Sequence, residues 1–298
     1  MHKTNKELSF RQIHIEVARN ATDDFNPFHD KHRWQNVAGN PFGGPIALGF
    51  QLECLIAQEM RRYRRDHNEG ELLRNEKLRY SSYEFRFVNA VKPQQDITID
   101  IKNSRFKTGD NPMLANRVSL LADGKLAVTG YKRDSLQTLY LEDPDLTALG
   151  DFEKARDRSY LDDKRTFLKR KYLTTSNAKN FLSGSLVEQA DYIDELAEKV
   201  LFPEIFPCAL LSSALLERAW QEGHDFEKEP MVYKSHSICI DRQLQNTLHS
   251  NDALHLLSRP TQGSTKNTSY ECFGIVGSDN LLFRARIDLM PLLEEQSS

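Results

Sequence analysis

The feature that most constrains this chain is a long internal repeat. An apolar run followed by alternating segments and a hairpin pattern occurs twice within 298 residues. The two apolar runs, 42–56 and 206–216, each carry a proline near their start, at Pro45 and Pro207. Proline suits the first turn of a helix, where its missing N–H costs least. Both runs are apolar nearly all round at the start, so the repeat predicts two buried helices.

Segments with strand periodicity follow each predicted helix, because apolar and polar residues alternate along them. A hairpin turn is expected at Asp123-Gly124 in the first half and around 277–280 in the second. The repeated order supports a duplication. The predicted strands and hairpins span 82–87, 96–102 and 114–133 in the first half, and 232–240, 253–257 and 269–289 in the second.

Each half is therefore predicted to be a buried helix wrapped by an antiparallel meander. One such sheet exposes an edge and a face, so two copies should lie side by side. We expect an α+β fold with a first domain at 1–140, a linker at 141–162 and a second domain at 163–298. The charged linker lacks sustained apolar periodicity and is expected to hold a short helix.

Composition argues against several classes of protein. The net charge of -3 gives no general attraction to nucleic acid. Mean hydropathy is -0.60, and no apolar run approaches the roughly 20 residues that span a bilayer. Four widely separated cysteines fit neither a zinc site nor a disulfide framework, and most of them should be small buried residues. Without an apolar leader at the start, a cytoplasmic location is expected.

The segment 20–30, just before the first apolar run, combines turn-forming residues with an aspartate and a histidine that could perform acid–base chemistry. Phe10, Ile13 and Val17 recur at helical spacing ahead of it, so a short helix should lead into it. Asn26 precedes Pro27, and proline restricts the backbone of both residues. The result is a rigid turn that can place a carboxylate and an imidazole on one side, as acid–base chemistry requires.

Here the sequence resembles a known family. The pattern Asp24-x-Asn26-Pro27-x-His29, followed by the block Phe42-Gly-Gly-Pro-Ile-Ala-x-Gly49, is similar to the signature of MaoC-like (R)-specific enoyl-CoA hydratases and dehydratases. The close resemblance covers about residues 20 to 56. It implies a double hotdog, that is, two hotdog domains in one chain, with a degenerate second half.

The resemblance also implies roles for individual residues. Asp24 and His29 would be the catalytic pair that binds and activates water, with their separate acid and base roles left open. The backbone N–H of Gly49 would receive the thioester carbonyl, which agrees with the charge-stabilising capacity of a helix N-terminus. The residues that would shape the site are Asn26, Pro27, Phe42, Gly44 and Pro45.

The sequence departs from the family pattern at several positions. Asp23 stands where the family usually has glycine, and Leu48 where it often has histidine. Trp34 and Gln35 occupy a stretch where small residues are common. In the second half, Leu211 aligns with Gly49, and the nearest counterparts of the motif, Ser176-Asn177 and Ser183-Gly184-Ser185, offer no carboxylate–imidazole pair.

The resemblance implies reversible hydration of trans-2-enoyl thioesters, or dehydration of 3-hydroxyacyl thioesters, as part of fatty acid metabolism. No metal or redox cofactor is expected, because coenzyme A or acyl carrier protein belongs to the substrate. Two alternatives stay open: an acyl-thioester hydrolase, and a non-catalytic acyl-thioester-binding or assembly protein. Two double-hotdog chains are also expected to be able to pair as a homodimer. The basic residues Arg61, Arg62, Arg64 and Arg65 are either carrier-phosphate contacts or a solvated helix end.

Overall fold

A computed structural model describes residues 2–3, 8–261 and 268–292 of the chain. The first half begins with short strands and a helix that leads into two 3₁₀ turns, and then forms the long central helix and its strands. Its elements are β1 His2–Lys3, β2 Leu8–Ser9, α1 Gln12–Thr22, η1 Pro27–His29, η2 Arg33–Asn36, α2 Gly49–Asp66, α3 Glu69–Asn75, β3 Tyr80–Phe87, β4 Asp96–Ile101, β5 Arg105–Lys107, β6 Met113–Ala122 and β7 Lys125–Ser135.

The second half repeats this order with additional short elements. Its elements are η3 Thr147–Leu149, β8 Ser159–Tyr160, β9 Phe167–Tyr172, α4 Thr175–Gly184, η4 Gln189–Asp191, β10 Ile193–Asp194, η5 Glu195–Ala197, β11 Lys199–Val200, α5 Ile205–Ala209, α6 Leu211–Gln221, β12 Met231–Asp241, α7 Arg242–Gln245, β13 Ala253–Pro260, β14 Ser269–Val276 and β15 Asn280–Pro291.

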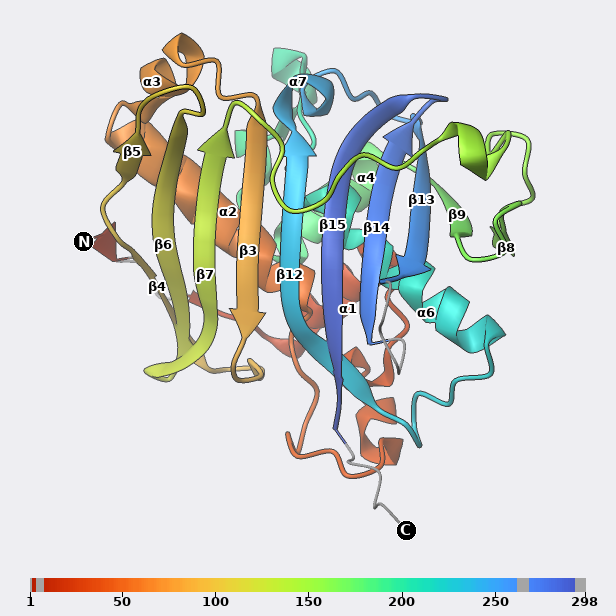
Figure 1. Cartoon of the computed structure of the whole chain (residues 1–298). Helices are drawn as coiled ribbons and strands as arrows, with labels where there is room; N and C mark the ends of the chain where they lie inside the picture. The colour runs from red at the N-terminus through yellow and green to blue at the C-terminus, as the bar shows by residue number, and fades with distance from the viewer. Residues whose placement is uncertain (1, 4–7, 262–267, 293–298) are drawn as a thin grey trace.

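The strands of both halves form one continuous antiparallel sheet. Along the sheet the main order is β1-β4-β6-β7-β3-β12-β15-β14-β13-β9-β8. The halves meet where β3 pairs with β12, with Tyr83 opposite Ile238. Figure 1 shows this sheet in front and the helices α1, α2, α4 and α6 behind it. The α+β prediction is confirmed, and the two expected sheets are fused edge to edge.

The central helices are buried because nearly every face of them is covered. Along the first turns of α2 every residue from Gly49 to Ile56 is buried, including the polar Gln51 and Glu53. Gln51 donates to the Gly184 carbonyl at 2.6 Å, and its Oε1 accepts the Leu48 N–H at 3.2 Å. The buried amide of Gln51 thus has protein partners for both its donor and its acceptor.

Helices α1 and α4 pack closely against each other at the junction of the two halves. A Cβ at Gly184 would lie 2.7 Å from the backbone nitrogen of Ala18 and 2.8 Å from the carbonyl oxygen of His14. Only glycine allows this approach, because the atoms in the way are mostly backbone. The buried face of α1 consists of Ile15, Ala18 and its neighbours, whereas Ile13, which the spacing placed on the apolar face, is 50% exposed.

The predicted strands and hairpins are all present, with bounds that differ by a few residues. The hairpin of β6 and β7 turns at Asp123 and Gly124, whose φ angles of 48° and 74° suit the expected tight turn. All four cysteines are free and buried. The first central helix starts later than predicted, because Pro45 lies four residues before α2. The second starts as predicted, with Pro207 in the first turn of α5, but it is not one helix, because α5 and α6 are separated at Leu210.

The segment 141–162 crosses the outer face of the second-half sheet as a strap (Figure 1). Its apolar residues Leu149, Phe152 and Leu161 are buried against Leu257 and Phe273. Tertiary packing of these scattered side chains therefore holds the strap in place. The sequence of the strap has no periodicity that would predict this packing.

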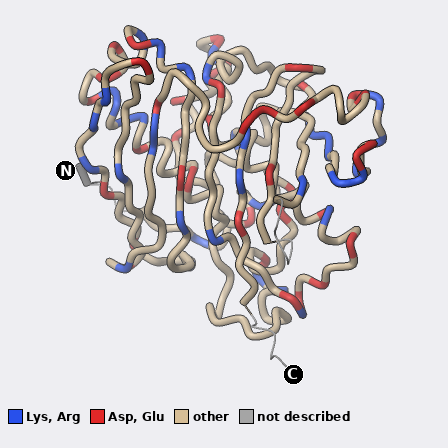
Figure 2. Tube along the Cα trace, viewed as in Figure 1, with Lys and Arg blue, Asp and Glu red and all other residues tan. Residues whose placement is uncertain are grey.

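Acidic and basic residues are interspersed over the trace in Figure 2, in keeping with the small net charge. Among the described residues, none of the helices combines the length and apolar character that crossing a bilayer requires.

The close contact of α1 and α4 gives a stability prediction. Gly184→Ala should lower the free energy of unfolding by about 1–3 kcal/mol, because the added methyl group overpacks the junction. Chemical denaturation measures the change.

The matched control is Gly70→Ala in α3, where a Cβ would meet only the end of the Arg74 side chain at 3.7 Å. That substitution should be neutral or raise stability by up to about 1 kcal/mol. Equal effects of the two substitutions would contradict the packing account.

Candidate active site

The site begins where α1 ends. Asp23 has a left-handed conformation with φ of 52° and closes the helix, as a C-terminal cap residue commonly does. The next N–H, that of Asp24, donates to the Arg19 carbonyl at 3.0 Å. This reversal turns Asp24 into the interior, where it is 2% exposed.

Two short side-chain bonds stiffen the following turn. The Asp24 Oδ1 accepts the Asn26 N–H at 3.1 Å, and the Asn26 Oδ1 accepts the Phe28 N–H at 3.1 Å. Pro27 occupies the first position of η1, where no N–H is needed. The turn predicted from the sequence is therefore present. The side chains of Asp24 and Asn26 each accept the backbone N–H two residues further along.

His29 completes the turn and is 6% exposed. Its Nδ1 lies 2.8 Å from the carbonyl oxygen of Ile46, which can only accept, so Nδ1 carries the proton. In the neutral ring Nε2 is then left with a lone pair, and it lies 3.9 Å from the Oδ2 of Asp24. The structure brings the two predicted residues together with an imidazole of fixed tautomer facing a carboxylate.

Arg19 holds the two ends of this turn together. Its Nε donates to the Asp24 carbonyl at 3.0 Å, and its Nη1 lies 3.0 Å from the Asp30 carboxylate. Backbone N–H groups of Arg33 and His32, together with Arg19, lower the pKa of Asp30. The carboxylate of Asp30 thus fixes the far end of the loop through its ion pair with Arg19.

A cavity of about 430 Å³ lies beside His29, whereas Asp24 is not among the residues that line it. His29 and Asn26 line it from the motif loop, and Gly49 lines it from the first turn of α2. From the second half Leu215, Tyr233 and neighbouring apolar residues complete the wall. The cavity is therefore largely apolar, and both the His29 imidazole and the N-terminus of α2 line it.

Gly49 is the first residue of α2, so its N–H has no acceptor within the helix. A Cβ at this position would lie 3.0 Å from the ring of Phe87 and 3.1 Å from that of Tyr233. The glycine thus lets two aromatic rings pack against the helix tip. It serves packing as well as access to the backbone.

The second half contributes polar groups that the sequence did not single out. The hydroxyl of Tyr233 lies 2.8 Å from Ser212 Oγ. Burial, and then the charge of Asp24, raise the pKa of Tyr233 well above its ordinary value, so the hydroxyl stays protonated. Phe226 packs edge-on against Phe25 of the motif loop, with ring centroids 5.8 Å apart. Residues of both halves of the chain therefore form the site.

Comparisons with solved structures support the same architecture. The chain resembles RV0216 of Mycobacterium tuberculosis, described as having a double hotdog fold, with a TM-score of 0.60, 12% identity, and coverage of 98% of this chain and 96% of that one. A MaoC-like dehydratase from Phytophthora capsici gives a TM-score of 0.56, 10% identity and coverage of 97% and 95%. The chain has the double-hotdog fold of the MaoC-like dehydratases.

The peroxisomal multifunctional enzyme type 2 of Drosophila melanogaster is also similar, with a TM-score of 0.56 and 11% identity. The match covers 97% of this chain and 48% of that enzyme, so the double hotdog spans about half of it. No family model matches the sequence. No curated protein matches it either.

The structure places two of the residues that depart from the sequence pattern next to Asp24 and Gly49. Asp23 stands at the left-handed cap, a position that favours glycine. Its carboxylate points outward, where it forms an ion pair with Lys171 of β9. Leu48 caps α2 and is 1% exposed. Neither side chain lines the cavity among the described residues.

The remaining residues of the second sequence block differ in their roles. Phe42 lines the cavity and packs edge-on against Phe28 at 5.6 Å. Gly44 would meet nothing within 4 Å with a Cβ added, so packing does not demand glycine there. Pro45 leads into Ile46, whose N–H donates to the Phe28 carbonyl at 3.0 Å. That bond fixes the carbonyl that orients His29.

The four arginines of the basic run lie at the opposite end of α2 from Gly49, so a contact with the carrier of a thioester bound at Gly49 has no support from the geometry. Arg62 pairs with Glu59, and Arg65 with Asp66. Arg64 is buried against Asp134, and Arg61 lies over the ring of Tyr192. Of the residues that the structure describes, the Lys and Arg side chains that line the cavity are instead Lys92 and Lys125.

A second acid–imidazole pair lies deeper in the core. His236 Nδ1 is 2.9 Å from Glu53 Oε1, and both residues are fully buried. Glu53 stands one turn after Gly49 on α2, and the His236 ring contacts Phe87 and Tyr233 with centroids 4.9 and 4.4 Å apart. This pair supports the aromatic rings that cover the helix tip. Strand periodicity alone gave no signal for it.

The turn gives a testable prediction. Asn26→Ala removes the acceptor for the Phe28 N–H and should lower the free energy of unfolding by about 1 kcal/mol, as the loss of a cap does. Thermal or denaturant unfolding measures this change.

Asn36→Ala is the control, because Asn36 is exposed and no bond of its side chain occurs among the described residues. If both variants unfold like the unmodified chain, the capping role of Asn26 is wrong.

Proposed function

We propose that the chain catalyses the reversible addition of water to trans-2-enoyl thioesters. The observation that carries this proposal is the buried Asp24–His29 pair, with Nε2 and Oδ2 separated by 3.9 Å, together with the cavity that His29 and Gly49, the first residue of α2, both line. Hydration needs a bound water with its protons held and a place for negative charge on the thioester oxygen. His29 on the cavity wall, with Asp24 next to it, can hold the water, and the Gly49 N–H can stabilise the charge.

A water molecule can donate one O–H to the lone pair of His29 Nε2 and the other to Asp24 Oδ2. Its oxygen then attacks Cβ of the enoyl group while one proton passes to the pair. The electrons of the Cα–Cβ double bond move toward the thioester carbonyl, whose oxygen gains negative charge beside the Gly49 N–H. The proton returns from the pair to Cα, which completes the addition. Dehydration follows the same steps in reverse.

The tautomer favours His29 as the group that first takes the proton. Its Nδ1–H is committed to the Ile46 carbonyl, so Nε2 is the basic atom that faces the cavity. Asp24 is held by the Asn26 N–H through Oδ1, which leaves Oδ2 to orient the water. The chemistry requires no metal or redox cofactor, because all charge is carried by these residues and the substrate.

The catalytic pair gives the first functional prediction. Asp24→Asn and His29→Ala should each lower the rate of crotonyl-thioester hydration by about a hundredfold or more, because general acid–base catalysis contributes that much. Loss of enoyl absorbance measures the rate, and circular dichroism verifies that the fold persists.

His32→Ala is the matched control, since His32 is exposed three residues further on. Unchanged hydration in both site variants would refute the proposal. Release of free thiol without loss of the double bond would indicate a thioester hydrolase instead. Thermal stabilisation by acyl-CoA without turnover would indicate a binding protein.

We further propose that Lys92 and Lys125 contact the phosphates of the carrier. Both are exposed and line the same cavity as Gly49. An ammonium group attracts phosphate as a point charge, and at an exposed position this attraction is modest and weakened by salt.

The variants Lys92→Gln and Lys125→Gln should therefore raise KM for a coenzyme A thioester by about threefold to tenfold at low salt, with kcat unchanged. Steady-state kinetics measures both constants. The same acyl group on N-acetylcysteamine, which has no phosphate, should show no change. Lys107→Gln on β5 is the control, and an equal KM for all three variants would contradict the assignment.

A further inference from the structure

The loop after α4 in the second half has the same backbone as the motif loop after α1. Leu186 is left-handed with φ of 59°, as Asp23 is with φ of 52°. The next N–H, that of Val187, donates to the carbonyl five residues back at 2.9 Å, as that of Asp24 does at 3.0 Å. The Tyr192 N–H then bonds to the Gln189 carbonyl at 2.9 Å, as the His29 N–H bonds to that of Asn26 at 3.1 Å.

The counterparts of Asp24 and His29 are therefore Val187 and Tyr192. The sequence had placed them earlier, at Ser176-Asn177 and Ser183-Gly184-Ser185, which lie within α4 or directly after it. Val187 has no acidic group. The Tyr192 hydroxyl donates to Gln58 Oε1 at 2.9 Å. The second loop thus keeps the shape of the first and has lost its acid–imidazole pair.

A second cavity, of about 290 Å³, lies beside Tyr192 as the first lies beside His29. The start of α5 lines it at Ile205, and the later turns of α2 line it at Ala57 and Met60. The first cavity has the reverse arrangement, with the start of α2 and the later turns of α6. The second cavity is therefore the counterpart of the first in the other half of the repeat.

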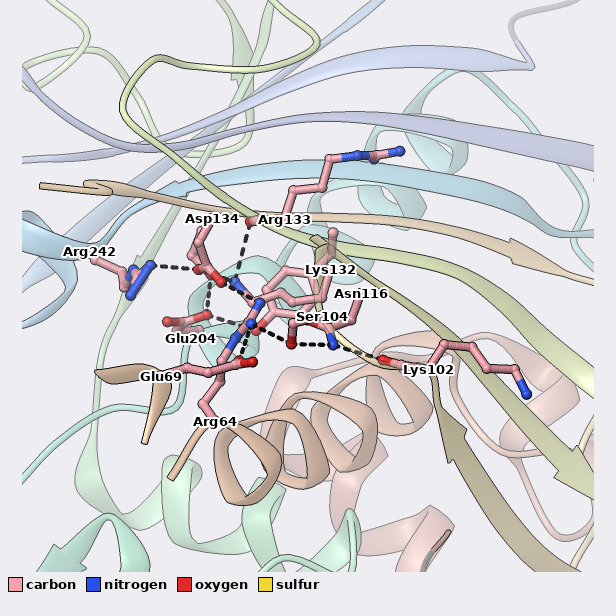
Figure 3. A network of polar contacts seen from close by, with 12 residues as sticks. Arg64, Glu69, Lys102, Ser104, Asn116, Lys132, Arg133, Asp134, Glu204 and Arg242 are labelled. Carbon is pink, nitrogen blue, oxygen red and sulfur yellow. Dashed lines mark hydrogen bonds and ion pairs between the residues drawn. The ribbon is translucent and has the colours of Figure 1, made fainter. Parts of the chain in front are cut away.

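The walls of this second cavity are charged. Asp134 lies between three cations, with Lys132 Nζ at 2.8 Å, Arg64 Nη2 at 2.9 Å and Arg242 Nη2 at 2.5 Å (Figure 3). Burial opposes the ionisation of Asp134, but these cations outweigh it and hold its pKa far below the ordinary value. Glu204 accepts the Tyr83 hydroxyl at 2.7 Å. Burial opposes the ionisation of Glu204 as well, but the charges of Lys132 and Arg242 outweigh it and lower the pKa of Glu204. Both carboxylates of the wall are thus ionised and already bonded.

Positive charge exceeds negative charge around the cavity. Within the described part of the chain, four basic side chains line it, against the carboxylates of Asp134 and Glu204 and a third one, Glu69, which pairs with Arg64 from outside. One positive charge is left unbalanced. Arg61 is exposed at the surface and lies over the Tyr192 ring, 4.6 Å from its centroid, with no carboxylate partner among the described residues. The basic residues of the wall are Arg61, Arg64, Lys132 and Arg242.

The rest of the wall is apolar and includes Cys54, Met60, Leu73 and Phe202. The volume holds roughly ten groups of the size of a water molecule. A singly charged head matches the single unbalanced cation, and an apolar body matches the remaining surface. Phosphate, with its higher charge and no apolar part, fits less well.

We propose that this second cavity binds a small organic monocarboxylate, with the carboxylate at Arg61 and an unbranched apolar tail of about seven carbons along α2. The site is separate from the proposed hydratase site and does not depend on it. It uses the same place in the repeated fold for recognition of a different ligand.

Isothermal titration calorimetry of the full chain with octanoate tests the proposal. Octanoate should bind, whereas octan-1-ol and octylamine, which lack the negative charge, should not bind in this cavity. Arg61→Gln should weaken octanoate binding about tenfold, the effect of losing a charge-assisted hydrogen bond. Arg65→Gln is the matched control on the same helix end, because Arg65 does not line the cavity, and it should leave the affinity unchanged.

Ala57→Leu fills the cavity from α2 and should abolish octanoate binding, with a melting temperature measured in parallel to verify the fold. The rate of enoyl-thioester hydration gives an independent readout and should be unchanged in Arg61→Gln. Octanoate affinity that is the same in Arg61→Gln, Ala57→Leu and the unmodified chain would place binding elsewhere and overturn the proposal, as would no octanoate binding at millimolar concentration.

Discussion

The pairing of β3 with β12 is the contact on which the rest of the molecule depends. It fuses two half-sheets and brings the end of one strand beside the beginning of the other, because the pair is antiparallel. Phe87, at the end of β3, therefore meets Tyr233, near the start of β12, over the tip of α2. The Glu53–His236 bond crosses the same junction from helix to strand. Neither half alone could close the first cavity.

Much of this architecture could be predicted from the sequence because strand alternation and tight turns are local signals. The turn at Asp123-Gly124 is an example, since both residues have the left-handed backbone that Asp-Gly favours. The start of α2 could not be placed in the same way. Proline at position 45 suits an extended strand as well as a first helical turn. Tertiary bonds decide the matter, because the N–H groups of Ile46 and Ala47 bond to the carbonyls of Phe28 and Val91.

The same division holds in the candidate site. Asp24 and His29 could be found together because only four residues, one of them a proline, lie between them, so short-range geometry keeps them close. The Ile46 carbonyl that orients His29, and Tyr233 that covers Gly49, come from distant parts of the chain, and no local pattern indicates them. The position of the basic run after residue 60 follows from helix geometry. Twelve residues of helix separate Gly49 from Arg61, about 18 Å, so the charges belong to the other end of the helix.

The two halves of the repeat share a backbone path, which packing constrains, but differ in side chains, which the chemistry of each site constrains. Helices α1 and α4 meet so closely at Gly184 that their C-terminal ends, and the loops that leave them, keep one backbone path in both halves. The side chains of these loops carry no such constraint. One loop can therefore present Asp24 and His29 while the other presents Val187 and Tyr192, with a bonded ionic cluster nearby. Removing one partner of such a cluster would leave a buried charge unpaired, which is costly, so the cluster is expected to persist once formed.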